Sequence, residues 1–500
     1  MDERANHGSS KKPRNKRQIS RRRVLSATGA AGVAGFAGCI NSGGGGGNGD
    51  SGGLDIGEYD GEEVTLEYAT APLFGDIQDE LVESMHNAGL PENISVEFST
   101  GVWGADDQQD RYTQILQAGQ STPDIMLTNF SYTSAFAPRG WLVDLNEALP
   151  QEKLDELESD YHQTMVDSMR WEGGLYGIPQ FVDIPAILYR KDYVENAGYD
   201  PEGENWATEP MTWSEFSEIV SDTVEENDLD HGYTLTLNQR TIAHQTGYEK
   251  LVTMGGNYFG DMENQHGPIG DRPITVDDEP VVETLRLLRT FMHGSDDEYA
   301  LEDISGGILP SEALGWDTQP SQESFQAGQA AFHRNWSYAI AQFAGEDAFG
   351  EDLGVMPFPY GVSKEEAKYE GTGGTNATLG GWHLSLNPNS ENLAAAVELI
   401  QAMTSDQFYL DIFELTGSTP PKPELYESDQ AEEVPIMNRY LDTLRLQSEN
   451  QWVHPINAIW DSQSEAIADE FTACLEQEQS PEEAAAAAQE AVEEIEQTEA

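Results

Sequence analysis

Apolar residues along the chain recur at two spacings, one typical of strands and one typical of helices. Short apolar runs at residues 64–68, 94–98 and 123–127 predict buried strands. Between them, residues 77–87 and 111–118 place their apolar side chains at helical spacing. Because strands that alternate with helices are typical of a parallel α/β sheet, the first part of the chain is expected to form an α/β lobe.

The apolar pattern changes after Trp171, where a Gly-Gly turn leads into an extended apolar segment that reaches Arg190. Beyond it the pattern predicts helices at 212–225, 281–292, 392–403 and from 406, a strand at 379–386, and a helix, strand and helix within 325–343. Residues 481–496 have too few apolar positions for a core helix and predict an exposed terminal helix. About 440 residues follow residue 60, too many for one core, so two domains are expected.

The chain is strongly acidic, with 26 Lys and Arg residues against 90 Asp and Glu residues. Nine basic and two acidic residues precede Cys39, so the part from Cys39 onward carries 17 minus 88, or −71. Its 10 Trp, 19 Tyr and 17 Phe residues indicate a globular protein rather than a disordered one. So acidic a surface excludes nucleic acid as a partner and is tolerable where concentrated salt screens it, so we expect the extracytoplasmic protein of a halophile.

The first 60 residues predict an export signal and a tether. Twin arginines, Arg21 and Arg22, precede an uncharged run rich in Ala and Gly that ends in small residues before Cys39. This order is typical of a twin-arginine lipoprotein signal peptide over 1–38, and the run is too short for a transmembrane helix. Cys39 would carry the lipid, and the Gly-rich segment 39–60 would tether the protein to the extracellular face of the membrane. A disordered basic tail is the other interpretation.

The chain contains only two cysteines, which indicates that no disulfide framework holds the fold. Cys39 belongs to the lipid site, and Cys474 lies alone in a helical apolar pattern, where a small buried residue is expected. The ten histidines are dispersed, and no cluster of His, Cys, Asp or Glu shows metal-ligand spacing. Neither a metal nor a cofactor is therefore expected.

Seven short motifs follow one another along the chain. They are Pro123-Asp124-Ile125, Gly140-Trp141-Leu142-Val143-Asp144-Leu145, Leu175-Tyr176-Gly177-Ile178-Pro179, Ile187-Leu188-Tyr189-Arg190-Lys191-Asp192, Met211-Thr212-Trp213-Ser214-Glu215-Phe216, Phe325-Gln326-Ala327-Gly328-Gln329-Ala330-Ala331-Phe332 and Gly380-Gly381-Trp382. In this order, over residues 61 to about 480, the chain resembles the sugar-binding lipoproteins of ABC importers, the family of maltose and trehalose binding proteins. The resemblance implies a two-lobed α/β fold of the type II periplasmic-binding-protein kind, each lobe a mixed sheet flanked by helices, with a three-segment hinge.

The same resemblance implies that each lobe is discontinuous in sequence. The expected ranges are 61–181 plus 336–382 for the N-terminal lobe and 187–333 plus 388–500 for the C-terminal lobe. The hinge crossings are expected near 181–186, 332–335 and 382–387. A ligand would bind in the cleft outside the carboxyl ends of the strands, and the rigid lobes would close on it.

A sugar site needs carboxylates or amides for the hydroxyl edges and aromatic rings for the C–H faces. Asp183 lies inside an apolar extended run beside Phe181 and resembles the cleft aspartate with which relatives accept bonds from sugar hydroxyls. Trp336 and Tyr338 belong to Asn335-Trp336-Ser337-Tyr338, which resembles the family's Asn-Trp-x-Tyr, where the Trp stacks on the sugar and the Tyr can bond to it. The alternatives are a surface acid for Asp183 and core rings for Phe181 and Trp336.

Five further positions bear on the expected cleft. Gly381 and Trp382 lie at another crossing, where glycine lets backbone N–H groups approach a ligand and the ring can stack on it. Asn129 follows the last clear strand of the first lobe, where relatives carry an acid or an amide. Arg111 is a candidate ligand for sugar hydroxyls, or else a partner of the neighbouring acids. Lys422 stands where relatives often show an arginine, and a single ammonium does not reproduce a planar grip.

These residues predict a binding module and not an enzyme. The leading hypothesis is a monomeric, lipid-tethered receptor that captures a mono- or oligosaccharide and delivers it to the transmembrane permease of an ABC importer. A secreted glycosidase is one alternative, because it also has aromatic-lined sugar sites and needs two carboxyl groups about 5 to 10 Å apart. Another is the same scaffold binding a polyamine, iron or another small solute, where acids and cation–π contacts would hold a polyamine.

Overall fold

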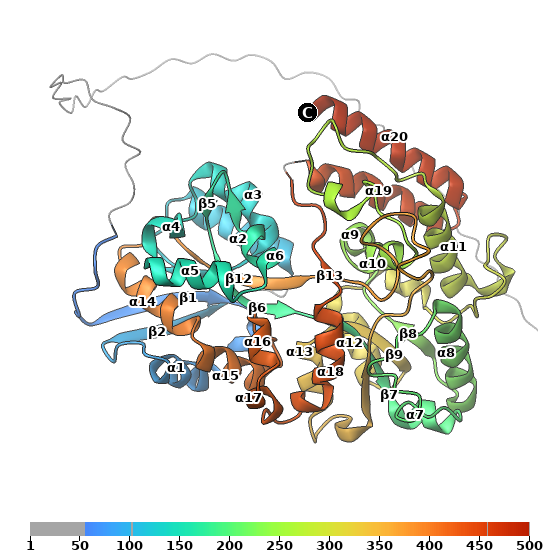
Figure 1. Ribbon diagram of the computed structural model, residues 1–500, viewed down its shortest axis with the longest axis horizontal. Coiled ribbons are helices and arrows are strands. Elements are labelled where there is room, and N and C mark those ends of the chain that lie inside the picture. Colours follow the sequence, from blue (N-terminus) through green and yellow to red (C-terminus); the bar gives the residue numbers. More distant parts are fainter. Residues whose placement is uncertain (1–55, 102–103, 458, 500) are drawn as a thin grey trace, which may run out of the picture. The chain divides into compact units, whose positions relative to one another are not determined.

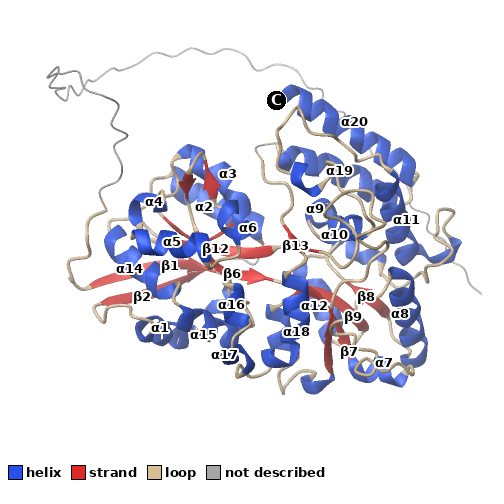
Figure 2. Ribbon diagram, in the orientation of Figure 1, coloured by secondary structure: helices blue, strands red, loops and turns tan. Residues whose placement is uncertain are grey.

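The computed structural model describes residues 56–101, 104–457 and 459–499. The predicted signal peptide, Cys39 and most of the predicted tether lie outside these residues. Within the described ranges, no helix combines the length and the apolar character needed to cross a lipid bilayer. Figure 2 shows the main strands gathered in two groups with helices around each.

The first sheet has five strands in the order β2-β1-β3-β12-β6. Figure 1 labels four of them, β2, β1, β12 and β6. The strands are β1 (Val64–Thr70), β2 (Ile94–Thr100), β3 (Ile125–Asn129), β6 (Ile178–Asp183) and β12 (Gly380–Leu386). β1 pairs in parallel with β2 and β3, whereas β12 runs antiparallel to β3 and β6. The sheet is therefore mixed, and the strand predicted near 379–386 joins the sheet that begins at residue 64.

Alternating side chains bury both faces of this sheet. On β3, Ile125 and Leu127 belong to one hydrophobic core, and Met126 between them belongs to another. Helices from distant parts of the chain supply the first core, namely α1 (Gln78–Asn87), α14 (Leu393–Met403) and α15 (Asp406–Thr416). The second core is covered by α2 (Ala105–Gln117) and α3 (Thr133–Phe136). The short helices α4 (Leu145–Ala148), α5 (Gln151–Ser159) and α6 (Gln163–Ser168) and the hairpin of β4 (Arg170–Trp171) and β5 (Gly174–Leu175) lead into β6.

The second sheet has four strands in the order β10-β7-β9-β8. The strands are β7 (Pro185–Arg190), β8 (His231–Thr234), β9 (Ala330–Trp336) and β10 (Leu353–Met356). The helices packed against it include α7 (Lys191–Asn196), α8 (Trp213–Asn227), α12 (Thr318–Gln326), α13 (Tyr338–Phe343) and α18 (Leu441–Ser448). α8 begins with the predicted capping box, in which Thr212 and Glu215 bond to each other's backbone N–H.

A second group of helices extends the core of the second sheet. It contains α9 (Gln239–His244), α10 (Thr246–Thr253), α11 (Glu279–His293), α19 (Trp460–Leu475) and α20 (Pro481–Glu499). Two short helices, α16 (Pro423–Tyr426) and α17 (Asp429–Glu432), precede α18, and β11 (Ala377–Thr378) pairs with β13 (Gln451–Trp452). Cys474 on α19 is fully buried, which confirms the expectation for that residue, and burial raises the pKa of its thiol to about 11.

The chain passes directly from the first sheet to the second through Ile184, inside the range expected for one crossing. The other two crossings lie beside the expected ranges, because β9 stays in the second sheet as far as Trp336 and β12 belongs to the first sheet from Gly380 onward. Two segments also differ from the predicted lobe ranges: β10 pairs with β7, whereas α14 and α15 pack with the first sheet. Both sheets use the same α/β pattern, so the pattern alone does not assign a helix to one of them.

The terminal helix α20 differs from its predicted exposed character. Its Ala484, Ala485, Ala488 and Val492 side chains are fully buried against α19 and α11. Small side chains on one stripe let two helices approach closely, so four such residues are enough to form a packed face. Near the end of α20, the Glu496 carboxylate bonds to Arg272, with the Nη2 and Oε2 atoms 3.0 Å apart.

Glutamate at position 488 is expected to destabilise the protein, because it would place a carboxylate without a partner in the interface between α20 and α19. We expect Ala488→Glu to lower the free energy of unfolding by about 3 kcal/mol. The matched control is Ala486→Glu, because Ala486 is exposed on the same helix and should change stability by less than about 0.5 kcal/mol. Urea unfolding in molar salt measures both variants, and equal effects would show that this face of α20 is not packed.

Candidate functional site

A cavity of about 680 Å³ opens between the end of the first sheet and the group of helices that contains α9 and α19. One wall is formed by the ends of β3 and β6 and the start of β12. Trp336 at the end of β9 also lines the cavity, and the opposite wall comes from α9, the start of α19 and the residues between β13 and α19. The volume lies in the range of small-molecule sites, and the carboxyl ends of β3, β6 and β9 open into it.

Asp183 is the last residue of β6 and lines this cavity. Only 7% of the residue is exposed, and its Oδ1 atom has no hydrogen-bond partner among the described residues. Burial raises the pKa of the carboxyl group to about 7, although the Arg334 guanidinium opposes part of this shift. A buried carboxylate with an unused oxygen gains free energy from a ligand that donates a hydrogen bond to it.

Two indole rings line the same cavity. Trp336 lies against Gly380, and a Cβ atom at position 380 would approach Cζ3 of the ring to 2.7 Å and Cβ of Asp183 to 2.8 Å. Glycine at this position therefore lets the ring and the carboxylate lie beside the start of β12. Trp382 lies two residues further along β12, where it pairs with Asn129 on β3. Rings of this kind can stack on the apolar faces of a ligand.

Asn129 and Gly381 also line the cavity, but each has a structural role there. The Asn129 side chain accepts a hydrogen bond from the Ser131 backbone N–H at 3.1 Å and donates one to the Gly381 carbonyl at 3.4 Å. At Gly381 φ is +149°, and a Cβ atom would lie 2.7 Å from the Phe181 carbonyl oxygen and 2.4 Å from Met165 Cε. The packing around β12 thus requires glycine at position 381 irrespective of any ligand.

Three of the predicted site residues do not line the cavity. Phe181 is buried in the first core, where its ring centroid lies 5.8 Å from that of Phe74. The Tyr338 hydroxyl donates to the side chain of Gln322 at 3.4 Å, and burial, with Asp183 nearby, raises the pKa of that hydroxyl. Arg111 on α2 donates to Ser99 Oγ on β2 at 2.6 Å. The structure thus brings together five of the eight predicted residues: Asp183, Trp336, Trp382, Gly381 and Asn129.

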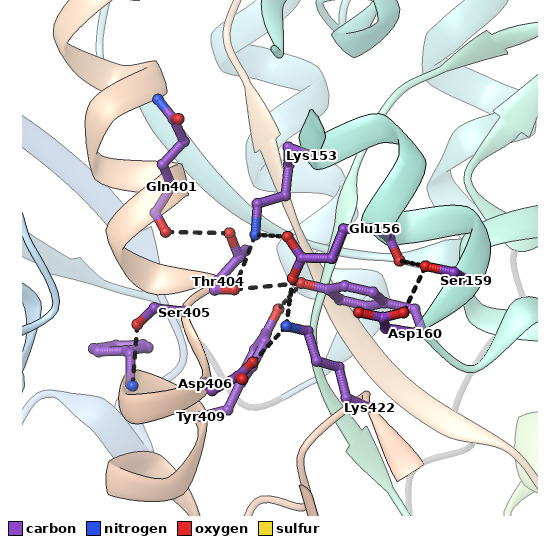
Figure 3. Close-up of polar contacts among 12 residues, drawn as sticks. Lys153, Glu156, Ser159, Asp160, Gln401, Thr404, Ser405, Asp406, Tyr409 and Lys422 are labelled. Atoms are coloured by element: carbon purple, nitrogen blue, oxygen red, sulfur yellow. Dashed lines mark hydrogen bonds and ion pairs between the residues drawn. The ribbon is translucent and has the colours of Figure 1, made fainter. Parts of the chain in front are cut away.

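Lys422 is also absent from the cavity lining. Figure 3 shows its ammonium directed at the carboxylates of Glu156 and Asp406, and the Lys422 Nζ and Asp406 Oδ1 atoms are 2.5 Å apart. The ammonium lies 5.1 Å from the centre of the Tyr161 ring and 5.8 Å from that of Tyr409. Lys422 therefore holds α5 and α15 together on the first sheet. It does not take the place of an arginine that contacts a ligand in this cavity.

The opposite wall carries a cluster of rings, His244, His454 and Trp460, that was not predicted from the sequence. Trp460 Nε1 donates to His244 Nδ1 at 3.1 Å, and the two histidine rings lie 5.1 Å apart. Burial lowers the pKa of His244 and lowers that of His454 to about 4, so both rings are neutral at pH 7. These residues come from segments more than 200 residues apart with no local motif, so only the folded chain brings them together.

Four residues that line the cavity carry buried polar atoms with no partner within the described residues. These atoms are Asp183 Oδ1, Ser131 Oγ, Thr378 Oγ1 and Asn457 Nδ2. Buried polar groups are almost always hydrogen-bonded in native proteins, so each of these atoms is available to bond to a polar ligand or to water. Hydroxyl oxygens can both donate and accept, which suits a set of one carboxylate, two hydroxyls and one amide N–H.

Among the residues that the structure describes, no group of three or more His, Cys, Asp or Glu side chains could hold a metal ion. The cavity instead combines unused polar atoms with aromatic rings on two walls. An α/β protein with two main sheets, a direct strand-to-strand crossing and a cavity of this composition belongs to the class of proteins that bind small solutes between their lobes.

The chain belongs to the bacterial extracellular solute-binding protein family, whose model matches residues 91–408. This is a family of receptors rather than of enzymes, and the resemblance recognised in the sequence is confirmed at the level of the family. A probable ABC transporter-binding protein of Deinococcus radiodurans is 25% identical over 302 residues, which are 59% of this chain and 61% of that protein. The chain thus matches less than two thirds of this relative's length.

Two further proteins are similar to this chain, one in sequence and one in structure. A probable amino-acid ABC transporter periplasmic-binding protein of Sinorhizobium fredii is 23% identical over 60% of each chain. The solved structure of maltose-bound MalE3 of T. maritima superposes with a TM-score of 0.69 over 86% of this chain and 98% of the other, at 21% identity. At this identity the likeness confirms the predicted two-lobed fold alone.

Proposed function

We propose that this protein is the receptor of an ABC importer and binds a mono- or oligosaccharide in the cavity beside Asp183. The single observation that carries the proposal is the set of unused polar atoms at Asp183, Ser131, Thr378 and Asn457 in a cavity lined by Trp336 and Trp382. Sugars present hydroxyl groups at their edges and C–H groups on their faces, so they need both kinds of contact in one place.

The comparisons support this proposal without deciding the solute. The structurally similar protein of T. maritima is maltose-bound, whereas the relative from S. fredii is named for amino acids. An amino acid carries two charges, and its ammonium would favour a ring face open to a cation. In this chain the Arg334 guanidinium carbon already lies 4.0 Å from the centre of the Trp336 ring, which favours a neutral ligand on that ring.

We further propose that the receptor is exported by the twin-arginine pathway, is lipid-anchored through Cys39 and is a monomer that delivers its sugar to the permease. The lobes would close by rigid motion about the crossings next to Ile184, Trp336 and Leu379. The acidic composition supports a protein that works in concentrated salt, where the repulsion between its carboxylates is screened.

A thermal-shift screen in molar salt tests the proposal, because a ligand that binds only the folded state raises the melting temperature with its concentration. The screen contains mono- and disaccharides, amino acids and spermidine. We expect at least one sugar to raise the melting temperature by several degrees at millimolar concentration.

Trp336→Ala should reduce that sugar-dependent shift sharply without removing it, because the ring stacks on the sugar while the polar contacts remain. The matched control is Trp171→Ala, since Trp171 is a half-buried ring outside the cavity lining. A shift with spermidine or an amino acid but with no sugar would contradict the proposal. A sugar shift of unchanged size in Trp336→Ala would place the sugar elsewhere.

A further inference from the structure

Behind Trp336 lies a buried ion pair that does not line the cavity. The guanidinium carbon of Arg334 is 4.0 Å from the centre of the Trp336 ring, so the planar cation covers one face of the indole. Arg334 is 3% exposed and is absent from the cavity lining, whereas Trp336 lines the cavity. The two residues are two apart on β9 and therefore point to the same side of the strand.

Glu249 on α10 fixes the orientation of that guanidinium. Arg334 Nε donates to Glu249 Oε2 at 3.1 Å, and Arg334 Nη2 donates to Glu249 Oε1, so the carboxylate holds both arms of the fork. Glu249 is fully buried and has a second cation beside it, the Lys250 ammonium at 3.9 Å. A bidentate pair fixes the plane of the guanidinium, which a single-point contact does not do.

The fixed plane of the Arg334 guanidinium in turn limits where the Trp336 ring can lie. One ring face rests on the guanidinium, and an edge of the ring rests on Gly380, where no side chain intervenes. These contacts leave the other face of the indole for the cavity. The Arg334 charge also acts on Asp183, since it opposes part of the rise in the pKa of that carboxyl group.

We propose that Arg334, held by Glu249, is a positioning residue for the sugar-stacking ring of Trp336. The inference rests on the proposed function, but it names residues that do not touch the sugar. Lysine at position 334 would keep the positive charge beside Glu249 and lose the flat surface under the indole. The ring would then sample more orientations, and a sugar would bind less tightly because it must order the ring on binding.

Fluorine NMR of protein labelled with 5-fluorotryptophan tests the positioning without a ligand. The Trp336 signal is assigned by its loss in Trp336→Phe. We expect Arg334→Lys to shift and broaden this signal while the signals of the other tryptophans stay in place. Arg334→Met serves as a second variant, because it leaves Glu249 with Lys250 as a partner. An unchanged Trp336 signal in the folded Arg334 variants would overturn the proposal.

The matched control is Arg289→Lys. Arg289 also forms a buried bidentate pair, with Asp297, and its guanidinium carbon lies 4.9 Å from the Tyr299 ring, but none of these residues lines the cavity. Arg289→Lys should lower the melting temperature and leave the Trp336 signal unchanged. If Arg334 had only a structural role, Arg334→Lys would likewise lower the melting temperature and leave the Trp336 signal unchanged.

A double-mutant cycle with maltose, measured by calorimetry in molar salt, tests the consequence for binding. We expect Arg334→Lys to weaken maltose binding about tenfold in the wild-type background. In the Trp336→Ala background the same substitution should change the affinity less than twofold. If Arg334→Lys weakened maltose binding as much in the Trp336→Ala background as in the wild-type background, the proposal would be overturned. A wild-type protein that binds none of the sugars in the screen would contradict the proposed function instead, and the NMR experiment still decides the positioning.

Discussion

Asparagine at position 183 is expected to weaken sugar binding at least tenfold and, above pH 7, to stabilise the free protein. The loss of affinity follows because an amide is a weaker acceptor for sugar hydroxyls than a carboxylate, and hydrogen bonds to charged groups contribute about 1.5 to 3 kcal/mol. The gain in stability follows because Asp183 is buried with an unused Oδ1 atom, so ionising it in the folded state is unfavourable.

The pH dependence of this effect has a definite sign. Burial raises the folded-state pKa of Asp183 from 3.8 to about 7, so the folded protein binds a proton that the unfolded chain has lost between these values. The stabilisation that this bound proton gives to the folded protein is therefore complete below about pH 4 and is lost as the pH rises to 7. A shift of about three pKa units corresponds to on the order of 4 kcal/mol.

The free energy of unfolding of Asp183→Asn should accordingly be close to that of the wild type at pH 4 and exceed it most above pH 7. Urea unfolding across this range measures the difference. Sugar affinity of the wild type, measured by calorimetry, should rise over the same interval because the carboxylate becomes ionised. The control is Asp277→Asn, since Asp277 is exposed and should change neither quantity. An affinity that is independent of pH in the wild type would show that Asp183 does not bind the sugar as a carboxylate.

Alanine at position 249 is expected to lower the free energy of unfolding by about 3 to 5 kcal/mol. Glu249 is the carboxylate between two cations, Arg334 and Lys250, and all three side chains are buried. Removal of one partner from a buried ion pair leaves uncompensated charge in a low-dielectric environment, which is strongly destabilising. Burial already lowers the pKa of Lys250 to about 7, and the loss of the Glu249 charge should lower it further.

Glu283→Ala provides the comparison for that variant. Glu283 pairs with Arg286 at 2.7 Å, but both side chains are 31% exposed, so the pair should contribute less than about 1 kcal/mol. Urea unfolding of both variants in molar salt measures the difference. Similar losses in the two variants would show that the Glu249 pair is screened and has no special role behind Trp336.

The sequence predicts those site residues that lie in a short motif or interrupt an apolar run. Asp183 interrupts an apolar extended run, and Trp336 and Trp382 lie in family motifs beside strand crossings, so pattern and resemblance together place them in the cavity. Tyr338 belongs to the same motif as Trp336, but it begins α13 and its hydroxyl bonds to Gln322 outside the cavity lining. Two residues of separation across the end of a strand are enough to change the direction of a side chain.

The opposite wall could not be predicted, because its residues share no local pattern. His244 ends α9 and Trp460 begins α19, and the two meet only when the helices of the second sheet's core assemble. The same limitation applies to α20, where alanines carry little apolar weight in a sequence pattern and yet form a packed stripe. The pairing of Arg334 with Glu249 spans 85 residues and likewise has no sequence signal.

The most direct test of the central claim is a calorimetric titration of the wild-type protein in molar salt with the sugars of the screen, followed by chromatography of the recovered sugar. A receptor that binds its sugar in the cavity beside Asp183 should bind one sugar per chain and return it unchanged after prolonged incubation. Binding of spermidine or an amino acid in place of every sugar, or the release of shorter sugars, would contradict a sugar receptor that performs no chemistry.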